Sequence, residues 1–134
     1  MITQVERITA DGALLACIVR AEARTGETTF LTPPDYNFQV GLVVYPEGGQ
    51  IAPHEHRPAT RSVEGTFEVL LVREGRCEVD IYDRARRCVA TRELRAGDLL
   101  LVVVGGHGFR MLEDTTLLEI KQGPYAGEGE KEQF

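Results

Sequence analysis

The sequence predicts an all-β protein whose strands form a sandwich or a barrel. Short apolar runs recur along the chain between turn residues, and very little has the period of a helix. A chain of 134 residues suits one domain, because it can bury a real core but is too short for two. Roughly ten short strands at this spacing are typical of antiparallel sandwiches and barrels.

The composition excludes several classes of protein. Apolar residues make up 43% and charged residues 27%, the balance of a soluble globular protein. The net charge of −6 argues against a nucleic-acid partner, because phosphates need a basic face. The longest apolar run, 99–104, is too short to span a bilayer, and no N-terminal segment resembles a signal peptide. We therefore expect a cytoplasmic protein with no membrane partner.

The N-terminal third predicts several strands. Ile2, Val5 and Ile8 precede an Asp11-Gly12 turn, which is a hairpin signal. The next run, 13–21, has alanines that tolerate helix, but its Cys-Ile-Val centre favours a strand. Further along, 29–32 predicts a short strand. The run 38–45 predicts a longer one, ended by Pro46 and two glycines.

The central region predicts a hairpin. The runs 67–75 and 76–83 meet at a Glu74-Gly75 turn, and Cys77, Val79 and Ile81 alternate with polar residues. This period of two predicts one buried face and one solvated face.

The C-terminal region begins with a run that is apolar at every position, 99–104. A strand that is apolar on both faces must be covered on both, by the protein interior on one face and by other residues on the other. We expect a second subunit to cover the outer face, and hence a homodimer. The segments 108–114 and 116–123 predict a final pair of strands. The Gly- and charge-rich segment 124–134 predicts a loosely ordered tail.

The three histidines are the strongest chemical signal. His54 and His56 occupy alternate positions, so on a strand both point to one face and can bind one metal ion. Glu68 shares a face with apolar residues, where an unpaired carboxylate is costly and requires a cation. His107 follows two glycines, where the chain can bend closely. Three imidazoles and a carboxylate suit a divalent transition metal better than calcium or magnesium.

These residues resemble the motifs of the cupin family. The first cupin motif is matched by Gly48, then five residues, then His54 and His56, and by Glu68, then six residues, then Gly75. The second motif is matched more loosely, by Gly97, Gly105 and His107. The sequence departs from the family in three ways. Eleven residues separate His56 from Glu68 instead of three or four, the second motif is one residue short and lacks its proline, and Met111 replaces an asparagine.

The resemblance, which extends to a group of small bacterial cupins, implies a fold and a site. The fold would be a single cupin-type β-barrel (a double-stranded β-helix, or jelly roll) over residues 1–134. Its core barrel would cover about 36–122, with N-terminal strands at 1–32 and a loose tail at 124–134. One divalent Fe, Mn, Ni or Zn ion would be held by four ligands: His54, His56, Glu68 and His107. Glu64 is an alternative to Glu68, although only Glu68 keeps the motif spacing to Gly75.

Weaker signals concern the substrate. Arg57 and Arg61 lie in the enlarged loop and are candidate clamps for a carboxylate or phosphate, although solvated loop cations are the simpler interpretation. Phe109 and Met111 are candidates for an apolar wall. Strand parity alone makes Tyr45 and Gln39 candidate hydrogen-bond partners for a substrate.

Three functions follow from the resemblance. The first is a metal-dependent enzyme, an oxygenase or isomerase acting on a small acidic or sugar-derived substrate. The second is a metal-free sugar-nucleotide epimerase or isomerase in which a histidine acts as base. The third is a non-catalytic module that binds a small ligand, because fold does not fix function. The residues identify no catalytic group and no substrate.

Overall fold

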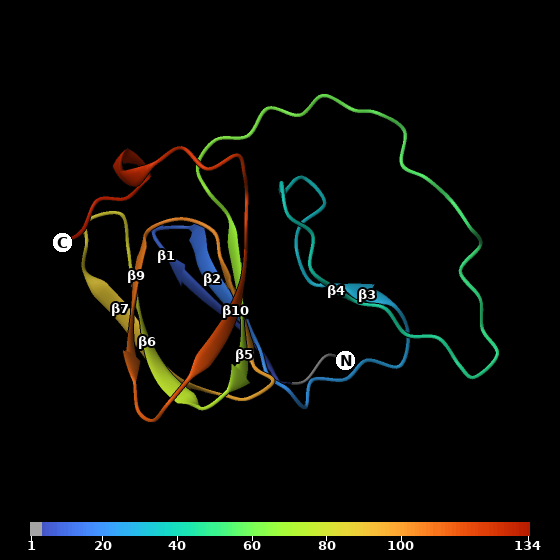
Figure 1. Ribbon diagram of the computed structural model, residues 1–134, viewed down its shortest axis with the longest axis horizontal. Helices are drawn as coiled ribbons and strands as arrows, with labels where there is room; N and C mark the ends of the chain where they lie inside the picture. The colour runs from blue at the N-terminus through green and yellow to red at the C-terminus, as the bar shows by residue number, and fades with distance from the viewer. Residues whose placement is uncertain (1–3) are drawn as a thin grey trace.

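The computed structural model describes residues 4–134, so Ile2 lies outside the described residues. Two antiparallel sheets face each other in a sandwich (Figure 1). The larger sheet has five strands in the order β1 (Val5–Ala10), β2 (Ala13–Val19), β8 (Leu99–Val102), β5 (Glu68–Glu74), β10 (Thr116–Lys121). The smaller has the order β7 (Cys88–Arg95), β6 (Arg76–Tyr82), β9 (Gly106–Met111). Two very short strands, β3 (Thr29–Phe30) and β4 (Gly41–Leu42), form a separate hairpin.

The main core lies between the two large sheets. The five-stranded sheet contributes Ile18 and Leu100, which are fully buried. The three-stranded sheet contributes Cys77, Val79 and Ile81, also fully buried, as the alternation in this segment predicts. The predicted hairpin at Glu74-Gly75 is wrong: the chain bends at Gly75, but β5 and β6 belong to different sheets and do not pair with each other.

A second apolar cluster covers the other face of the five-stranded sheet. Leu101 and Val103 pack there against Leu31 and Phe67, with side chains of the β3–β4 hairpin and its loop around them. The ring of Phe67 contacts the rings of Tyr36 and Phe38, each with a centroid distance of 5.9 Å. The chain's own residues therefore cover both faces of the 99–104 segment, so our reason for expecting a second subunit on that strand is wrong.

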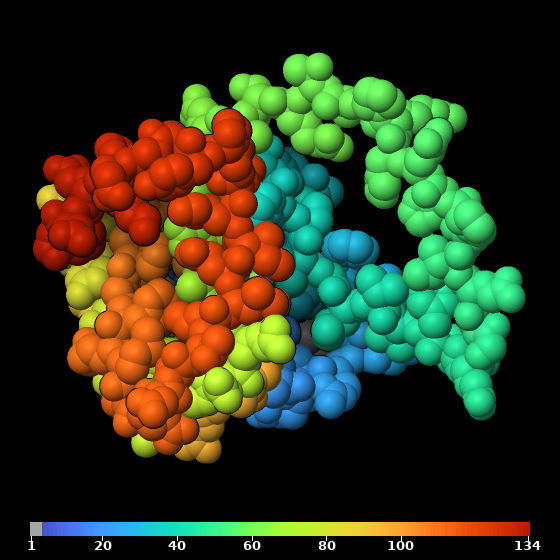
Figure 2. Space-filling model, in the orientation of Figure 1, coloured from blue at the N-terminus to red at the C-terminus, as the bar shows by residue number. Residues whose placement is uncertain are grey.

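Between β4 and β5 the chain leaves the two sheets. We call residues 43–66 the arm. Every residue from 43 to 65 is exposed, and none belongs to a strand. In Figure 1 the arm runs outward from the β3–β4 hairpin and returns to β5 in a wide loop, and in Figure 2 its atoms form a strip separated from the body. The predicted strand over 38–45 is therefore reduced to Gly41–Leu42.

The strands β9 and β10 lie on the side of the sandwich toward the viewer in Figure 1. The predicted final pair of strands is present, but the two do not pair with each other: β9 pairs with β6, and β10 pairs with β5. Each is the last strand of its sheet, so within residues 4–134 each has an outer edge without a partner strand. The all-β class is confirmed, but the sheets of the described chain do not close into a barrel.

The segment after β10 folds back onto the body. A short 3-10 helix, η1 (Glu128–Glu130), interrupts it. The ring of Phe134 packs on Tyr82 with a centroid distance of 5.0 Å, and Glu132 pairs with Arg86 at 3.0 Å. No helix within residues 4–134 has the length and apolar character needed to cross a membrane.

Candidate functional site

Glu68 and His107 meet between the two sheets. Glu68 begins β5 and pairs with Val102, so its side chain shares the inner face with Leu70 and Val72. His107 is the second residue of β9 and pairs with Ile81, so it also faces inward. His107 Nε2 lies 3.5 Å from Glu68 Oε2, and only 12% of the Glu68 side chain is exposed. The face predicted for Glu68, shared with apolar residues, is confirmed.

The backbone before His107 explains how the imidazole reaches this position. Gly105 has a φ of +82°, and a Cβ atom there would collide with the carbonyl oxygen of Tyr82. A Cβ atom on Gly106 would meet the ring of Phe134. Because neither glycine has a Cβ atom, the chain can pass close to the Tyr82 carbonyl oxygen and the Phe134 ring as it enters β9.

The charge state of Glu68 depends mainly on His107. The hydrogen bond from His107 lowers the pKa of the Glu68 carboxyl, while burial opposes this by disfavouring the charged form. His107 also lowers this pKa through its charge, and Glu119 and Lys121 lower it further. Both belong to β10, where they pair with Leu70 and Glu68 and so share the inner face. The alternation from Leu117 to Lys121 could have predicted these two neighbours.

The second ring nitrogen of His107 is exceptional. Among the described residues, His107 Nδ1 is the one buried side-chain nitrogen or oxygen that has no hydrogen-bond partner. Buried polar atoms in proteins nearly always have a partner, so such an atom needs an explanation. If Nε2 carries the proton and donates it to Glu68, Nδ1 presents a free lone pair.

His54 and His56 lie elsewhere, on the exposed arm. Their ring centroids are 5.4 Å apart, and His54 Nδ1 lies 2.9 Å from the carbonyl oxygen of Ala52. Within residues 4–134, no three His, Cys, Asp or Glu side chains converge in a way that could hold a metal ion. The structure thus joins two of the four predicted ligands, Glu68 and His107, and places the other two apart from them.

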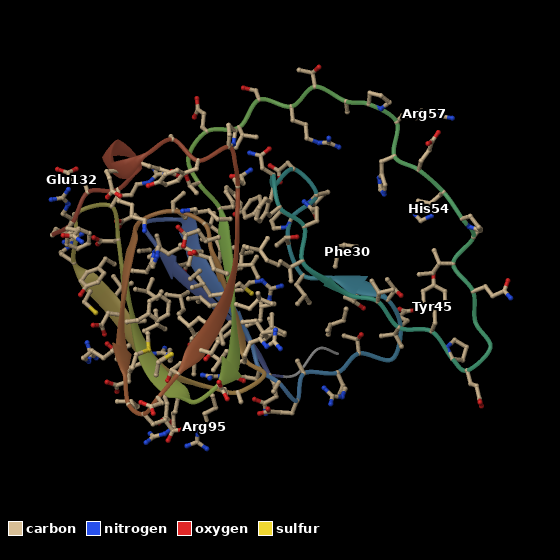
Figure 3. All side chains as sticks on the ribbon, viewed as in Figure 1. Phe30, Tyr45, His54, Arg57, Arg95 and Glu132 are labelled. Carbon is tan, nitrogen blue, oxygen red and sulfur yellow. The ribbon has the colours of Figure 1, made fainter. Side chains whose placement is uncertain are left out.

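The remaining residues of the enlarged loop are also on the arm. Arg57, Arg61 and Glu64 are exposed. Tyr45, with 52% of its surface exposed, lies near the base of the arm (Figure 3). Figure 3 also shows His54 and Arg57 on the part of the arm far from the two sheets. None of these side chains contacts the Glu68–His107 pair in this arrangement.

The other predicted substrate residues have separate positions. Phe109 packs against the inner core, and its ring lies 5.9 Å from that of His107, so it forms part of the apolar wall beside the pair. Met111 is 52% exposed at the end of β9. The Gln39 side-chain amide accepts a hydrogen bond from Thr32 and donates to the carbonyl oxygens of Pro33 and Tyr36, so it is already occupied within its own loop.

A surface hollow lies away from these residues. Its volume is about 490 Å³, and it is lined by Arg20, Glu93 and Asp98 among others. Its buried carboxylate, Asp98, accepts hydrogen bonds from Arg20 and from the backbone amides of Ala21 and Arg95. These bonds join β2 to the turn before β8, so Asp98 has a structural explanation.

No protein-family model, characterised protein or solved structure matches the chain. The likeness to cupins therefore depends on the motifs around the histidines and Glu68 alone.

Proposed function

We propose that this protein is a metal-dependent enzyme of cupin type, an oxygenase or isomerase, that acts on a small acidic or sugar-derived substrate. The observation that carries the proposal is the contact between Glu68 and His107 across the two sheets, together with the unpartnered His107 Nδ1. In this proposal these two residues are the fixed half of the metal centre, held between the sheets, and His54 and His56 on the arm would supply its other half.

The chemistry of the fixed half fits a transition metal. Metal-binding histidines commonly donate one ring N–H to a carboxylate, which fixes the tautomer and leaves the other nitrogen free for the metal. His107 has this arrangement, with Glu68 beside Nε2 and no partner at Nδ1. Glu68 would either orient His107 in this way or bind the metal itself, as the family resemblance implies. Both roles keep a buried carboxylate ionised.

The arm supplies the donors that are missing from the fixed half. His54 and His56 are adjacent on the arm, with ring centroids 5.4 Å apart. Movement of one short segment would therefore deliver two imidazoles together. Three imidazoles and a carboxylate favour Fe, Mn, Ni or Zn, and such a metal would supply Lewis acidity or O₂ activation to a bound substrate.

Metal analysis of the purified protein tests the proposal. We expect about one Fe, Mn, Ni or Zn ion per chain after expression in supplemented medium, and loss of that ion in the double variant His54→Ala/His56→Ala. The matched control is Glu47→Gln, which alters an exposed acidic residue on the same arm that is not a proposed ligand. A wild-type protein that carries no such metal and binds none on titration would overturn the proposal.

A metal-free acid–base site is a second candidate, and the direct Glu68–His107 contact favours it. A carboxylate that orients an imidazole produces a general base without help from the arm. Under this function, protein treated with a chelator would still be stabilised by sugar nucleotides in a thermal-shift assay, and His54→Ala/His56→Ala would leave that stabilisation unchanged. Under the metal function, both treatments abolish ligand-induced stabilisation. A non-catalytic ligand-binding module would bind a ligand in these assays without turning it over.

A further inference from the structure

The arm and the free strand edges are complementary features of the same chain. We propose that two copies of the protein exchange their arms, so that the arm of one copy adds strands to the free edges of β9 and β10 in the other. The resulting assembly is a closed dimer with twofold symmetry, in which each copy gives an arm and receives one.

The acceptor is the side of the sandwich between β9 and β10. Within residues 4–134 each strand is hydrogen-bonded to a neighbouring strand on one side only, which leaves a row of backbone groups available for another strand. Four large apolar side chains on this stretch are exposed: Met111, Leu112, Leu118 and Ile120. On the opposite side of the sandwich the two sheets are bridged, because Arg92 on β7 donates three hydrogen bonds to Glu6 on β1.

The donor is the arm. It exposes five large apolar side chains: Val43, Val44, Tyr45, Ile51 and Val63. A turn in which Gly49 N–H donates to the Pro46 carbonyl oxygen divides the arm into two segments, which is suitable for two neighbouring edges. Pro53 and Pro58 have no N–H to donate, so strand pairing in the second segment would be interrupted at these two positions. An exposed apolar arm and two exposed strand edges each favour aggregation, and the exchange removes both.

The base of the arm favours exchange over docking within one chain. It is held on the outer face of the five-stranded sheet, where Leu42 and Phe67 belong to the second apolar cluster. The Val44 N–H also donates to Thr28 Oγ1 at 2.9 Å. From this base the arm projects away from β9 (Figure 1). Exchange keeps the contacts of Leu42 and Phe67, whereas docking on the chain's own β9 would require the arm to reverse direction across β10.

The exchange also completes the proposed metal centre, and this part of the inference depends on the proposed function. His107 lies on β9, the strand that receives the arm. Addition of the segment after Pro53 would bring His54 and His56 of one copy beside Glu68 and His107 of the other. Each centre would then contain residues of both copies.

Sedimentation velocity at micromolar concentration tests the exchange without reference to metal. We expect a mass of twice the 14.9 kDa of the chain. Ile51→Asp should give a monomer, because it places a charge in the docked segment, while the chain itself leaves Ile51 57% exposed and should fold normally. The matched control is Val89→Asp, which changes a 42% exposed apolar residue of β7 on the opposite edge and should remain a dimer. A monomeric wild type, or an Ile51→Asp protein that stays dimeric, would overturn the exchange.

Mixed dimers test the composite centre. One chain carries His54→Ala and His56→Ala, the other carries Glu68→Gln and His107→Ala, and the two are co-expressed with different tags. Exchange creates one intact centre in each mixed dimer, so metal content should recover to half that of the wild-type dimer. Centres formed within single chains would give no recovery, and that result would overturn the composite centre. If the wild-type protein is a dimer that binds no metal, and Ile51→Asp converts the dimer to a monomer, the proposed function fails and the exchange stands.

Discussion

Glu68 and His107 come from different sheets, and their side chains meet between the inner faces of β5 and β9, with His107 Nε2 3.5 Å from Glu68 Oε2. His54 and His56 are separated from this pair by the arm, although Glu68 follows His56 by only twelve positions in the sequence. Of the predicted ligands, Glu68 and His107 lie on strands of the two sheets. His54 and His56 lie on the arm, which contains no strand. The two pairs should therefore respond differently to mutation.

The first prediction concerns this division. His54→Ala, His56→Ala and His107→Ala should each reduce metal occupancy strongly, because each removes an imidazole donor. Glu68→Gln should retain part of the metal, since an amide can still accept the hydrogen bond that orients His107. Plasma emission analysis measures the occupancy. If Glu64→Gln abolishes metal binding while Glu68→Gln does not, the carboxylate is assigned to the wrong residue.

The second prediction concerns the glycine that leads into β9. Gly105→Ala should destabilise the protein by about 3 kcal/mol or more, because it combines a positive φ with a collision between Cβ and the backbone of Tyr82. Gly12→Ala is the matched control, since Gly12 has a similar φ of +75° and no atom within 4 Å of an added Cβ. It should cost about 1 kcal/mol. Urea denaturation of both variants measures the difference, and equal midpoints would contradict the prediction.

The third prediction concerns acid stability. Asp83 accepts hydrogen bonds from the Arg87 backbone amide, the Arg87 side chain and the Ala85 backbone amide, and the Arg87 backbone bond is the largest cause that lowers its pKa below the ordinary 3.8. A pKa that is lower in the folded state stabilises the fold above the unfolded-state pKa, and this contribution is lost as the pH falls through the folded-state value.

Asp83→Asn should therefore destabilise the protein at pH 7 and make less difference near pH 3, which lies below the ordinary pKa of 3.8. Thermal unfolding at both pH values checks this, with the exposed Asp35→Asn as a control that should change little at either. An equal loss at both pH values would show that the shape of the side chain, and not its charge, matters at position 83.

The sequence predicts which face of a strand is buried more reliably than it predicts which strands pair with each other. Alternation correctly indicated the buried side of Cys77, Val79 and Ile81, because a period of two directly reports which side chains leave water. The same logic placed Glu68 on a face with apolar residues. Alternation carries no information about which strand lies beside which, so the separate partners of β9 and β10 were missed.

The arm shows a second limit of sequence patterns. Residues 38–45 and the His54-x-His56 pair have strand-like spacing, but a strand forms only where a neighbouring edge accepts it. The β3–β4 hairpin instead uses its apolar residues to cover Leu101 and Val103. The sequence of the run 99–104 does not indicate whether the residues that pack on its outer face come from the same chain or from another chain.

The last prediction concerns the two arginines of the arm. Arg57 and Arg61 are exposed, and an exposed cation contributes less than about 1 kcal/mol to binding an anion, because water and salt screen it. Their effect should grow if the arm docks beside Glu68 and His107, because water is then excluded from the surroundings. Arg57→Ala and Arg61→Ala should therefore weaken binding of small carboxylates and phosphates while metal content stays near that of the wild type.

A thermal-shift screen with acidic and neutral ligands measures this effect. The control is Arg84→Ala, which removes an exposed arginine from the turn between β6 and β7 and should leave ligand-induced stabilisation unchanged.

Shortening the segment 57–66 to four residues separates two roles of the arm. If metal remains and acidic ligands no longer stabilise the protein, the segment provides selectivity for anions. If metal is lost, the segment is needed to position the histidines or Glu68, and its role is structural. If neither changes, the segment is a spacer, and the two arginines have no part in ligand binding.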